Sequence, residues 1–302
     1  MKTIINPSTN PYFNLALEEY VLKHLDLDED VFFLWRNDPC VVIGRNQNPF
    51  NEINIHYTSS HNIPILRRIS GGGTVYHDHG NVNFTFITST IQERLNNYEF
   101  FIHPLIAILQ KTGVPARFVP SSHIYINDTK ISGNAQSFYK NKMMHHGTLL
   151  FESDLTHLKN VLHHHKHYNS KAVSSTRAST TNIKNHMTVS ATIEEFMDFI
   201  LNEYFIEDYH NHIVELNDED IKQINKIMND KYHSWSWNLG ETPEFWINEE
   251  IDGEIIQMRI HKGIVQESSF YPEDIEGLRF VEEELQERLP DSEHAKLHQL
   301  FQ

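Results

Sequence analysis

Apolar residues along this chain follow two periods, one typical of helices and one typical of strands. After Asn10 and Pro11, a typical cap followed by proline at the first helical position, apolar residues recur at helical spacing through residue 25. The same spacing predicts further helices at 98–111, 192–204 and 218–231. Short runs rich in β-branched and aromatic residues predict strands at 31–35, 40–43, 63–66, 82–87, 116–119, 124–126 and 144–151. We expect the first two strands to pair, because only a turn-like segment separates them.

The pattern breaks at Ser234–Gly240 and Thr242-Pro243, and we interpret this break as a boundary between residues 1–240 and 244–302. Beyond it, the segments 244–251, 254–261 and 263–270 predict a small antiparallel sheet, with Asp252-Gly253 as a hairpin turn. A closing helix at 272–289 is expected to complete this part of the chain.

One long segment, 163–183, has little apolar periodicity. It is rich in histidine and then in serine and threonine, and it contains Lys171 and Arg177. Loops of this length are uncommon unless they are functional or disordered, so the segment is a candidate lid. Its histidines at 163–165 and 167 are a weak metal-site candidate, because consecutive histidines on a loop lack fixed geometry.

Composition narrows the class of protein. The chain has 302 residues, of which 39% are hydrophobic and 22% charged, as in a soluble globular protein. The formal net charge of −16 argues against broad binding to nucleic acids or anionic membranes. The single cysteine, Cys40, excludes an internal disulfide. No stretch has the roughly 18 apolar residues of a membrane helix, and no leader pattern is present, so we expect a cytoplasmic protein.

The run from Arg67 to Asn81 carries the first candidate chemistry. Glycines 71–73 offer no side chain to bury, and such residues are usually required for positive φ or for close approach of a ligand to the backbone. Their amides, with the forked guanidinium of Arg68, indicate an anion site suited to phosphate or pyrophosphate. The spacing matches neither a P-loop nor a dinucleotide fingerprint. His77 and Asp78 could form an acid/base pair or hold the turn by hydrogen bonds to the backbone.

These residues are part of a wider resemblance. Three motifs resemble, in their order and spacing, the lipoate-protein ligase family of the lipoyl/biotin ligase superfamily. They are the run Arg67–Asn83, then Lys130-x-Ser-Gly-Asn-Ala-Gln136, and then His146-Gly-Thr148. Further similar segments are Asn10–Glu19, Val42–Asn48 and Ser234–Gly240, so the resemblance covers nearly the whole chain.

The resemblance implies an α+β fold, with a large mixed and antiparallel-sheet catalytic domain of the biotin/lipoate ligase type at 1–240 and a small α+β accessory domain at 244–302. It also implies the activity. Lipoate is activated with ATP and Mg²⁺ to lipoyl-AMP, and the lipoyl group is then transferred to a lysine of an acceptor protein. The acceptor would be a lipoyl domain of a 2-oxoacid dehydrogenase or a glycine cleavage H-like protein, with no nucleic acid or membrane partner.

The resemblance also assigns roles to residues. It implies that Lys130 is catalytic and contacts both the lipoyl carboxylate and the α-phosphate, where a fixed cation would offset the repulsion between two anions. Segment 163–183 would be the adenylate-binding loop, with Ser175 and Arg177. The metal ligands are left unknown. The remaining nucleotide contacts would be Arg68, Gly73, Thr74, Val75, Tyr76 and Asn81; those to lipoate would be Ser70, Gly72 and His146. For the apolar slot we expect Trp35, Val42 and Phe86.

One segment departs from the family pattern. Before the lysine motif the family usually has Gly-Arg-Asn-Asp, whereas this chain has Pro120-Ser121-Ser122-His123. The missing arginine and carboxylate would set the chain apart as a divergent, second type of bacterial lipoate ligase. They also leave open a non-catalytic protein that binds lipoyl-adenylate or a lipoyl domain.

Two enzymatic alternatives remain. Octanoyltransferases or amidotransferases of the same fold use a cysteine nucleophile, but Cys40 lies in an apolar strand, far in sequence from the position of theirs. A biotin ligase is disfavoured by the lysine motif.

The departure at His123 generates the first prediction. Replacing His123 with Asp is expected to raise the rate of adenylate formation, because it restores the carboxylate of the family pattern. ATP–pyrophosphate exchange measures this rate directly. An exchange rate that is unchanged or lower in the variant would contradict the idea.

Overall fold

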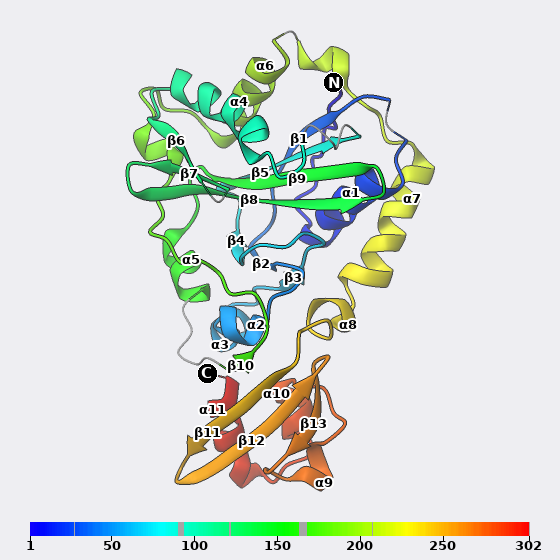
Figure 1. Ribbon diagram of the computed structural model, residues 1–302, viewed down its shortest axis with the longest axis vertical. Coiled ribbons are helices and arrows are strands. Elements are labelled where there is room, and N and C mark those ends of the chain that lie inside the picture. Colours follow the sequence, from blue (N-terminus) through cyan, green and yellow to red (C-terminus); the bar gives the residue numbers. More distant parts are fainter. Residues whose placement is uncertain (27, 90–93, 121, 163–167, 207, 302) are drawn as a thin grey trace.

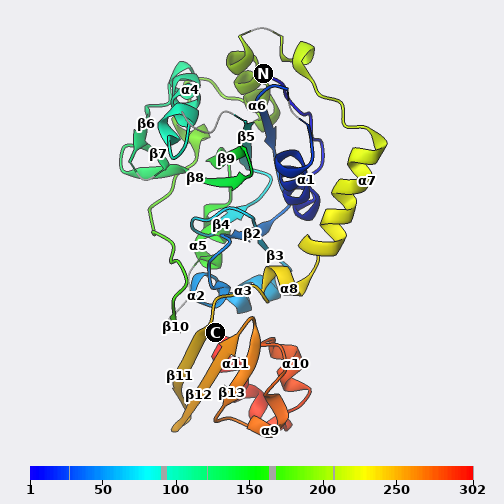
Figure 2. The same cartoon turned by 45° about the vertical axis from the view of Figure 1, so that its right-hand side comes forward.

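The computed structural model describes residues 1–26, 28–89, 94–120, 122–162, 168–206 and 208–301. Its largest element is a six-stranded sheet in which each strand runs antiparallel to its neighbours (Figures 1 and 2). In spatial order the strands are β1 (Val31–Trp35), β5 (Asn81–Thr88), β9 (Lys142–Leu150), β8 (Thr129–Tyr139), β7 (His123–Ile126) and β6 (Ala116–Val119). Strand β8 was not expected; the sequence suggested a turn that leads into a polar cluster.

A second, three-stranded sheet has β2 (Cys40–Ile43) at its centre. Strand β3 (Ile65–Arg67) is parallel to β2, and β4 (Val75–His77) is antiparallel to it. The expected pairing of 31–35 with 40–43 is therefore wrong, because β1 pairs with β5 and β2 lies in the other sheet. The reason is a buried link, since Asn14 Nδ2 donates to Arg36 O and to Asn37 Oδ1 and holds the connecting segment between the two sheets.

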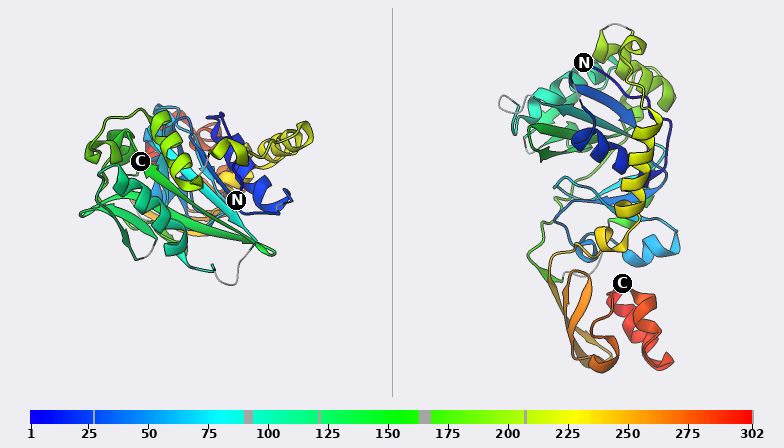
Figure 3. Two further views of the ribbon diagram at one scale, coloured as in Figure 1. Left: turned by 90° about the horizontal axis from the view of Figure 1, so that it is seen from above. Right: turned by 90° about the vertical axis from the view of Figure 1, so that its right-hand side faces the viewer.

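Helices cover both faces of the six-stranded sheet. On one face lie α4 (Tyr98–Lys111) and α6 (Ile193–Phe205), and on the other lie α1 (Pro11–Lys23) and the three-stranded sheet (Figures 1 and 3). The predicted cap of α1 is confirmed, since the Asn10 side chain accepts from the amides of Tyr12 and Phe13. The shorter helices are α2 (Pro49–Glu52), α3 (Ile55–Ser60), α5 (Leu155–Val161), α7 (Asp218–Ile227), α8 (Trp235–Asn238), the 3-10 helices η1 (Ile183–His186) and η2 (Tyr209–His212), and the π-helix η3 (Met228–Tyr232).

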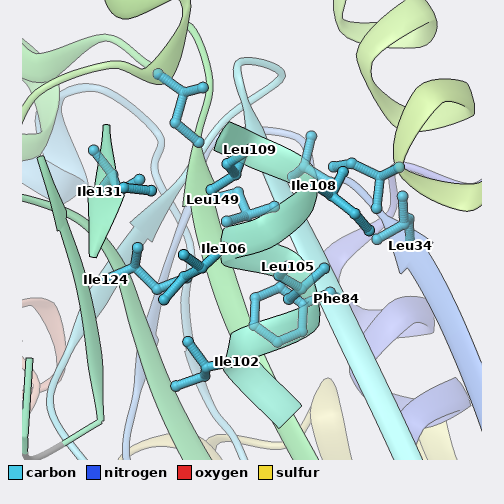
Figure 4. Close-up of a cluster of buried hydrophobic side chains, with 14 of the residues drawn as sticks. Leu34, Phe84, Ile102, Leu105, Ile106, Ile108, Leu109, Ile124, Ile131 and Leu149 are labelled. Atoms are coloured by element: carbon cyan, nitrogen blue, oxygen red, sulfur yellow. The ribbon is translucent and has the colours of Figure 1, made fainter. Parts of the chain in front are cut away.

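The main core lies between α4 and the sheet. Ile102, Leu105 and Leu109 of α4 pack against Phe84 of β5 and Leu149 of β9 (Figure 4). All five side chains are at most 1% exposed. Burial of such a side chain is worth about 1.5–3 kcal/mol, so this layer fixes the sheet on which the polar residues of the other face are mounted.

The C-terminal sheet domain has the predicted three strands and one that was not predicted. Strands β11 (Phe245–Ile251), β12 (Glu254–His261) and β13 (Ile264–Ser268) are antiparallel, and β10 (Asn169–Ser170) from the long loop pairs with β11. The hairpin turn is confirmed, with Asp252 and Gly253 both at positive φ.

The expected closing helix at 272–289 is wrong. The chain instead forms α9 (Pro272–Ile275), α10 (Glu282–Gln286), the 3-10 helix η4 (Asp291–Glu293) and α11 (His294–Phe301). The break has a physical reason, because Gly277 adopts φ of 85° and the chain then runs extended to form a bridge between Arg279 and Ile264. Phe50 of α2 packs into this domain against Phe245 and Phe280. Among the described residues, no helix combines the length and apolar character needed to cross a membrane.

A buried arginine joins the glycine segment to the chain that leads into the C-terminal sheet. Arg67 is fully buried, and burial is the main cause that lowers its pKa to about 10, so it stays protonated at neutral pH. No ion pair among the described residues involves it. Its guanidinium instead donates, over 2.9–3.2 Å, to Thr242 Oγ1 and to the carbonyls of Gly44, Arg45, Gln47, Trp237 and Asn238.

Replacing Arg67 with Lys is expected to lower the free energy of unfolding by about 3–5 kcal/mol, because an ammonium lacks the fork that serves so many oxygens at once. Urea unfolding at pH 7 measures the loss. Arg117→Lys is the matched control, since Arg117 is exposed and its polar contacts are local, a hydrogen bond to Asn127 O and an ion pair with the exposed Asp128, so its effect should stay within about 0.5 kcal/mol. Equal midpoints for the two variants would show that Arg67 does not join these segments.

Candidate active site

Two adjoining cavities lie on the face of the six-stranded sheet that meets the three-stranded sheet. The smaller has a volume of about 300 Å³ and the larger about 820 Å³. The residues that line both are Thr74, Val75, Lys130, Gly133, Thr148, Ser174, Ser175 and Thr176. Among the described residues of this shared set, Lys130 is the only one with a cationic side chain, so it stands where the two cavities meet.

The glycine run is shaped by Arg68. The Arg68 guanidinium donates to Gly71 O at 2.6 Å and Gly73 O at 2.8 Å, and also to Val42 O and Ser70 Oγ. Gly72 adopts φ of 86°, a conformation that favours glycine. Burial lowers the pKa of Arg68 to about 10. Arg68 therefore contributes its charge to the smaller cavity while its hydrogen bonds hold the run in place.

Lys130 is placed by strand β8 and by the long loop. Its backbone N–H donates to Ser179 O, and its carbonyl accepts from Thr181 N. Its side chain lies over Gly133, where an added Cβ would stand 3.1 Å from Nζ. Burial, and then the positive charge of Arg68, lowers the pKa of Lys130 to about 8. No ion pair among the described residues involves Lys130, so its charge is available to an anionic ligand.

The part of the long loop that the structure describes closes over both cavities. Gln47 Nε2 and Thr74 N each donate to Ser175 Oγ at 3.0 Å, and Ser175 N donates to the Glu52 carboxylate. Arg177 is exposed and lines the larger cavity. The histidines at 163–165 and 167, considered above as metal ligands, lie outside the described residues.

A hydrogen-bonded chain backs the smaller cavity. Ser70 Oγ lies 2.6 Å from His146 Nε2, and His146 Nδ1 lies 2.8 Å from Glu18 Oε1. Thr85 Oγ1 donates to the same carboxylate oxygen, and Trp35 Nε1 donates to Thr85. Since Arg68 Nε donates to Ser70, the chain runs from the indole of Trp35 to the glycine run.

Most of the expected site residues lie together, with differences in place. Gly72 and His146, expected at lipoate, line the smaller cavity. Arg68 and Gly73 were expected at the nucleotide but also line the smaller cavity. Tyr76, expected at the nucleotide, lines the larger cavity. Asn81 and Ser70 line neither cavity; they lie behind residues that line the smaller one, since Asn81 bonds to Asn83 and Ser70 to His146. In the apolar slot, Trp35 and Val42 line the smaller cavity, but Phe86 does not, because it faces the opposite side of the sheet and stacks on Phe32. Residues that the sequence analysis missed are Leu15, Glu18, Glu52 and Asn83.

The missed residues gave weak local signals. The helix that contains Glu18 was predicted from the spacing of its apolar residues, and its polar residues were not examined. The Glu18 side chain is nevertheless buried, with 2% of its surface exposed. A carboxylate on the buried side of a helix is unusual, and this was the one signal available. Asp78 supports the turn rather than acting as an acid or base, since it accepts from Gly80 N and Asp154 N, while His77 faces Asn37.

His123 stands beside Lys130 at the departure from the family pattern. It begins β7, pairs across the strands with Gly133, and lines the smaller cavity. Burial, and then the charge of Lys130, lowers the pKa of His123 to about 4. The side chain is therefore a neutral imidazole at neutral pH.

The donor set does not form a resident metal centre. The carboxylates that line the cavities are Glu18 and Glu52, and they are engaged by His146 and Thr85 and by Ser175 N, respectively. Within the described ranges, no group of three histidine, cysteine or acidic side chains could hold a metal ion. Mg²⁺ commonly takes ligands from nucleotide phosphates, so a bound substrate could supply them here.

Comparison with known proteins identifies the class. The model of the lipoyl protein ligase A/B catalytic domain matches residues 10–205. Lipoate-protein ligase 1 of Staphylococcus aureus is 40% identical over 272 residues, which cover 88% of this chain and 79% of that protein. The chain belongs to the lipoate-protein ligase family and is an enzyme. These relatives do not favour the amidotransferase or non-catalytic alternatives.

Solved structures share the fold. A bipartite lipoate protein ligase from Thermoplasma acidophilum superposes with a TM-score of 0.65 at 22% identity, covering 82% of this chain and 97% of that one. A lipoate-protein ligase A bound with ATP gives a TM-score of 0.65 at 23% identity, covering 80% and 98%.

The low pKa of Lys130 predicts a change of stability with pH. Below about pH 8 Lys130 is protonated in the folded and in the unfolded protein, and the folded protein is destabilised because this charge is desolvated and lies near Arg68. Between about pH 8 and 10.5 the unfolded chain binds the extra proton, so the free energy of unfolding rises with pH. Relative to Lys130→Met, the wild type should gain on the order of 2 kcal/mol across this window. Urea unfolding of both proteins at pH 7 and 10.5 measures the difference, and a constant difference would contradict the expectation.

Proposed function

We propose that the protein activates lipoate with ATP and transfers the lipoyl group to a lysine of an acceptor protein. The observation that carries this proposal is Lys130, a cation without an ion-pair partner among the described residues, at the junction of two cavities of unequal size. A reaction that joins a carboxylate to a phosphate needs a positive charge at the point where the two anions meet.

In this proposal the smaller cavity takes the lipoyl chain. Trp35, Val42 and Leu15 supply apolar walls that suit an alkyl tail. The shared wall, with Lys130 and the glycine run, would then hold the carboxylate, with Gly72 and His146 beside the chain and Ser70 holding His146.

The larger cavity takes the nucleotide. Its wall combines apolar side chains for a base with cations for phosphates, and Lys159 and Arg177 join Lys130 there. Thr74, Val75 and Tyr76 line it from the glycine run, next to Gly73 and Arg68. Asn81, the last of the expected nucleotide contacts, would act indirectly, because its side chain donates a hydrogen bond to Asn83.

The chemistry takes two steps. A carboxylate oxygen of lipoate attacks the α-phosphorus, the bond to the β-phosphate oxygen breaks, and pyrophosphate leaves. Lys130 stabilises the charge that develops between the carboxylate and the phosphate. The neutral amine of the acceptor lysine then attacks the acyl carbon, AMP leaves, and the amine proton passes to solvent.

The loop would protect the intermediate between these steps. A mixed anhydride is open to hydrolysis, and the contacts of Ser175 with Gln47, Thr74 and Glu52 support a role in excluding water. Arg177 would face the phosphate.

Several finer points belong to the same proposal. Mg²⁺ would enter with the nucleotide and neutralise the leaving pyrophosphate. The acceptor would be a lipoyl domain of a 2-oxoacid dehydrogenase or a glycine cleavage H-like protein; a lipoyl domain is the partner that accompanies the Thermoplasma ligase. Residues 1–240 would form the catalytic unit and 244–302 the accessory domain, in the cytoplasm.

Incubation with ATP, Mg²⁺, lipoate and a purified apo lipoyl domain is expected to add one lipoyl group to the acceptor, as read by intact mass. Lys130→Met should lower the rate at least about a hundredfold, the usual effect of removing a group that stabilises transition-state charge. The matched control is Lys140→Met, an exposed lysine of the same β8–β9 hairpin, which should keep the wild-type rate.

Two results would count against the proposal. Absence of any acceptor gain together with absence of ATP-dependent pyrophosphate release would reject the ligase. Acyl transfer without ATP that is lost in Cys40→Ser would instead support an amidotransferase. The fully buried Cys40 thiol, whose pKa is raised by burial, argues against that outcome.

A further inference from the structure

The hydrogen-bonded chain behind the smaller cavity has a fixed direction. The N–H groups of an arginine can only donate. Arg68 Nε donates to Ser70 Oγ at 2.9 Å, and among the described residues the other partner of that hydroxyl is His146 Nε2, at 2.6 Å. The buried hydroxyl therefore gives its proton to Nε2. The proton of the imidazole then lies on Nδ1 and is donated to Glu18 Oε1, 2.8 Å away.

A second chain of hydrogen bonds ends on the same oxygen. Trp35 Nε1 donates to Thr85 Oγ1 at 2.9 Å, and Thr85 Oγ1 donates to Glu18 Oε1 at 2.6 Å. Thr85 and His146 are direct cross-strand partners on β5 and β9, and Glu18 reaches both of them from α1. Both chains begin at a group that can only donate and end at Glu18, as suits an ionised carboxylate, which only accepts.

This arrangement is not that of a nucleophile. Ser70, His146 and Glu18 stand in the order of a serine–histidine–carboxylate triad. However, Ser70 is 1% exposed and lines neither cavity, and its oxygen already accepts from Arg68. The end of the chain that meets the site is therefore the guanidinium of Arg68 rather than a reactive hydroxyl.

Arg68 depends on this chain for one side of its guanidinium and for a compensating charge. Its other N–H groups hold Val42 O, Gly71 O and Gly73 O, so its position determines that of the glycine run. No ion pair among the described residues involves Arg68. The negative charge of Glu18 nevertheless acts on it, since it opposes the effect of burial on the Arg68 pKa.

We propose that Glu18 is a positioning residue, whose carboxylate acts through His146 and Ser70 to hold Arg68 and the glycine run in the geometry that adenylate formation needs. The effect on the rate rests on the proposed function, whereas the direction of the chain is a property of the folded protein. A small displacement of a site can cost up to about a hundredfold in rate, so a residue that acts only through others can matter this much.

ATP–pyrophosphate exchange with lipoate measures the effect. Glu18→Gln keeps an oxygen that can accept from His146 and Thr85 but removes the charge, and it should lower kcat at least about tenfold. The KM for ATP should change less than about threefold, because neither Glu18 nor Arg68 lines the cavity proposed for the nucleotide. Glu18→Leu, which also removes the acceptor, should lower kcat further.

The next residue of the same helix supplies the matched control. Glu19 is also a buried carboxylate, but it lines neither cavity and accepts from Lys231 and Tyr232 instead. Glu19→Gln should therefore keep the wild-type kcat. Equal losses of kcat in Glu18→Gln and Glu19→Gln would show a general structural effect and overturn the inference.

A double-mutant cycle tests whether the effect passes through Ser70. Ser70→Ala removes the link next to Arg68, so Glu18→Gln should lower kcat little further in that background. A loss of the same size in both backgrounds overturns the positioning role; if the wild type then still shows lipoate-dependent exchange, the proposed function stands. Absence of this exchange in the wild type overturns both.

The tautomer of His146 tests the direction of the chain without any change to Glu18. Nitrogen NMR of histidine-labelled protein at about pH 8, with His146→Gln to assign the signals, should show the proton on Nδ1 and a bare Nε2. This measurement decides the matter even if the Glu18 variants do not fold. A wild-type His146 with its proton on Nε2 overturns the inference.

Discussion

The buried guanidinium of Arg67 connects parts of the chain that are distant in sequence. It bonds at once to the segment after β2 and to the segment that leads into the C-terminal sheet. Trp237 returns a hydrogen bond to Arg67 O, and Asn238 Oδ1 accepts from Arg67 N. A buried cation without a carboxylate partner is tolerated only when its hydrogen bonds are satisfied, so these carbonyls must stay where they are. Because Arg67 is fixed, the backbone of the adjacent Arg68 is fixed too, and the Arg68 guanidinium holds the glycine run through Gly71 O and Gly73 O.

The site carries positive charge in a strongly acidic protein. Arg68 and Lys130 lie close enough that Arg68 contributes to the low pKa of Lys130. This arrangement opposes folding, as is common where a site is prepared for an anion. The neutral imidazole of His123 keeps that unbalanced charge, whereas an aspartate there would offset part of it. Two anionic substrates that meet at Lys130 would supply the missing negative charge.

The loop joins the site to the C-terminal domain. Its first described part, β10, pairs with β11, and its later part bonds to Lys130 and to the glycine run through Ser175. Tyr168 also packs against Phe245 in the core of the C-terminal domain. The loop that covers the cavities is therefore held at both ends by different domains, so its position and that of the C-terminal sheet are coupled.

Local sequence was sufficient for many of the elements. The cap at Asn10, the hairpin at Asp252-Gly253 and most strands were readable, because each depends on neighbours within a few residues. The anion site at the glycine run was inferred from local chemistry, whereas the role given to Lys130 came from the resemblance to the family. Only the tertiary structure decided which strands pair, since β1 and β2 are adjacent in sequence but lie in different sheets. It also decided that Phe86 faces the core while Asn83, three residues earlier, faces the cavity: alternate residues of a strand point to opposite sides, and only packing settles which side is the site. The hydrogen bonds that end on Glu18 could not be read from sequence, because their members come from α1, β1, β5, β9 and the segment after β3 and become neighbours only in the folded protein.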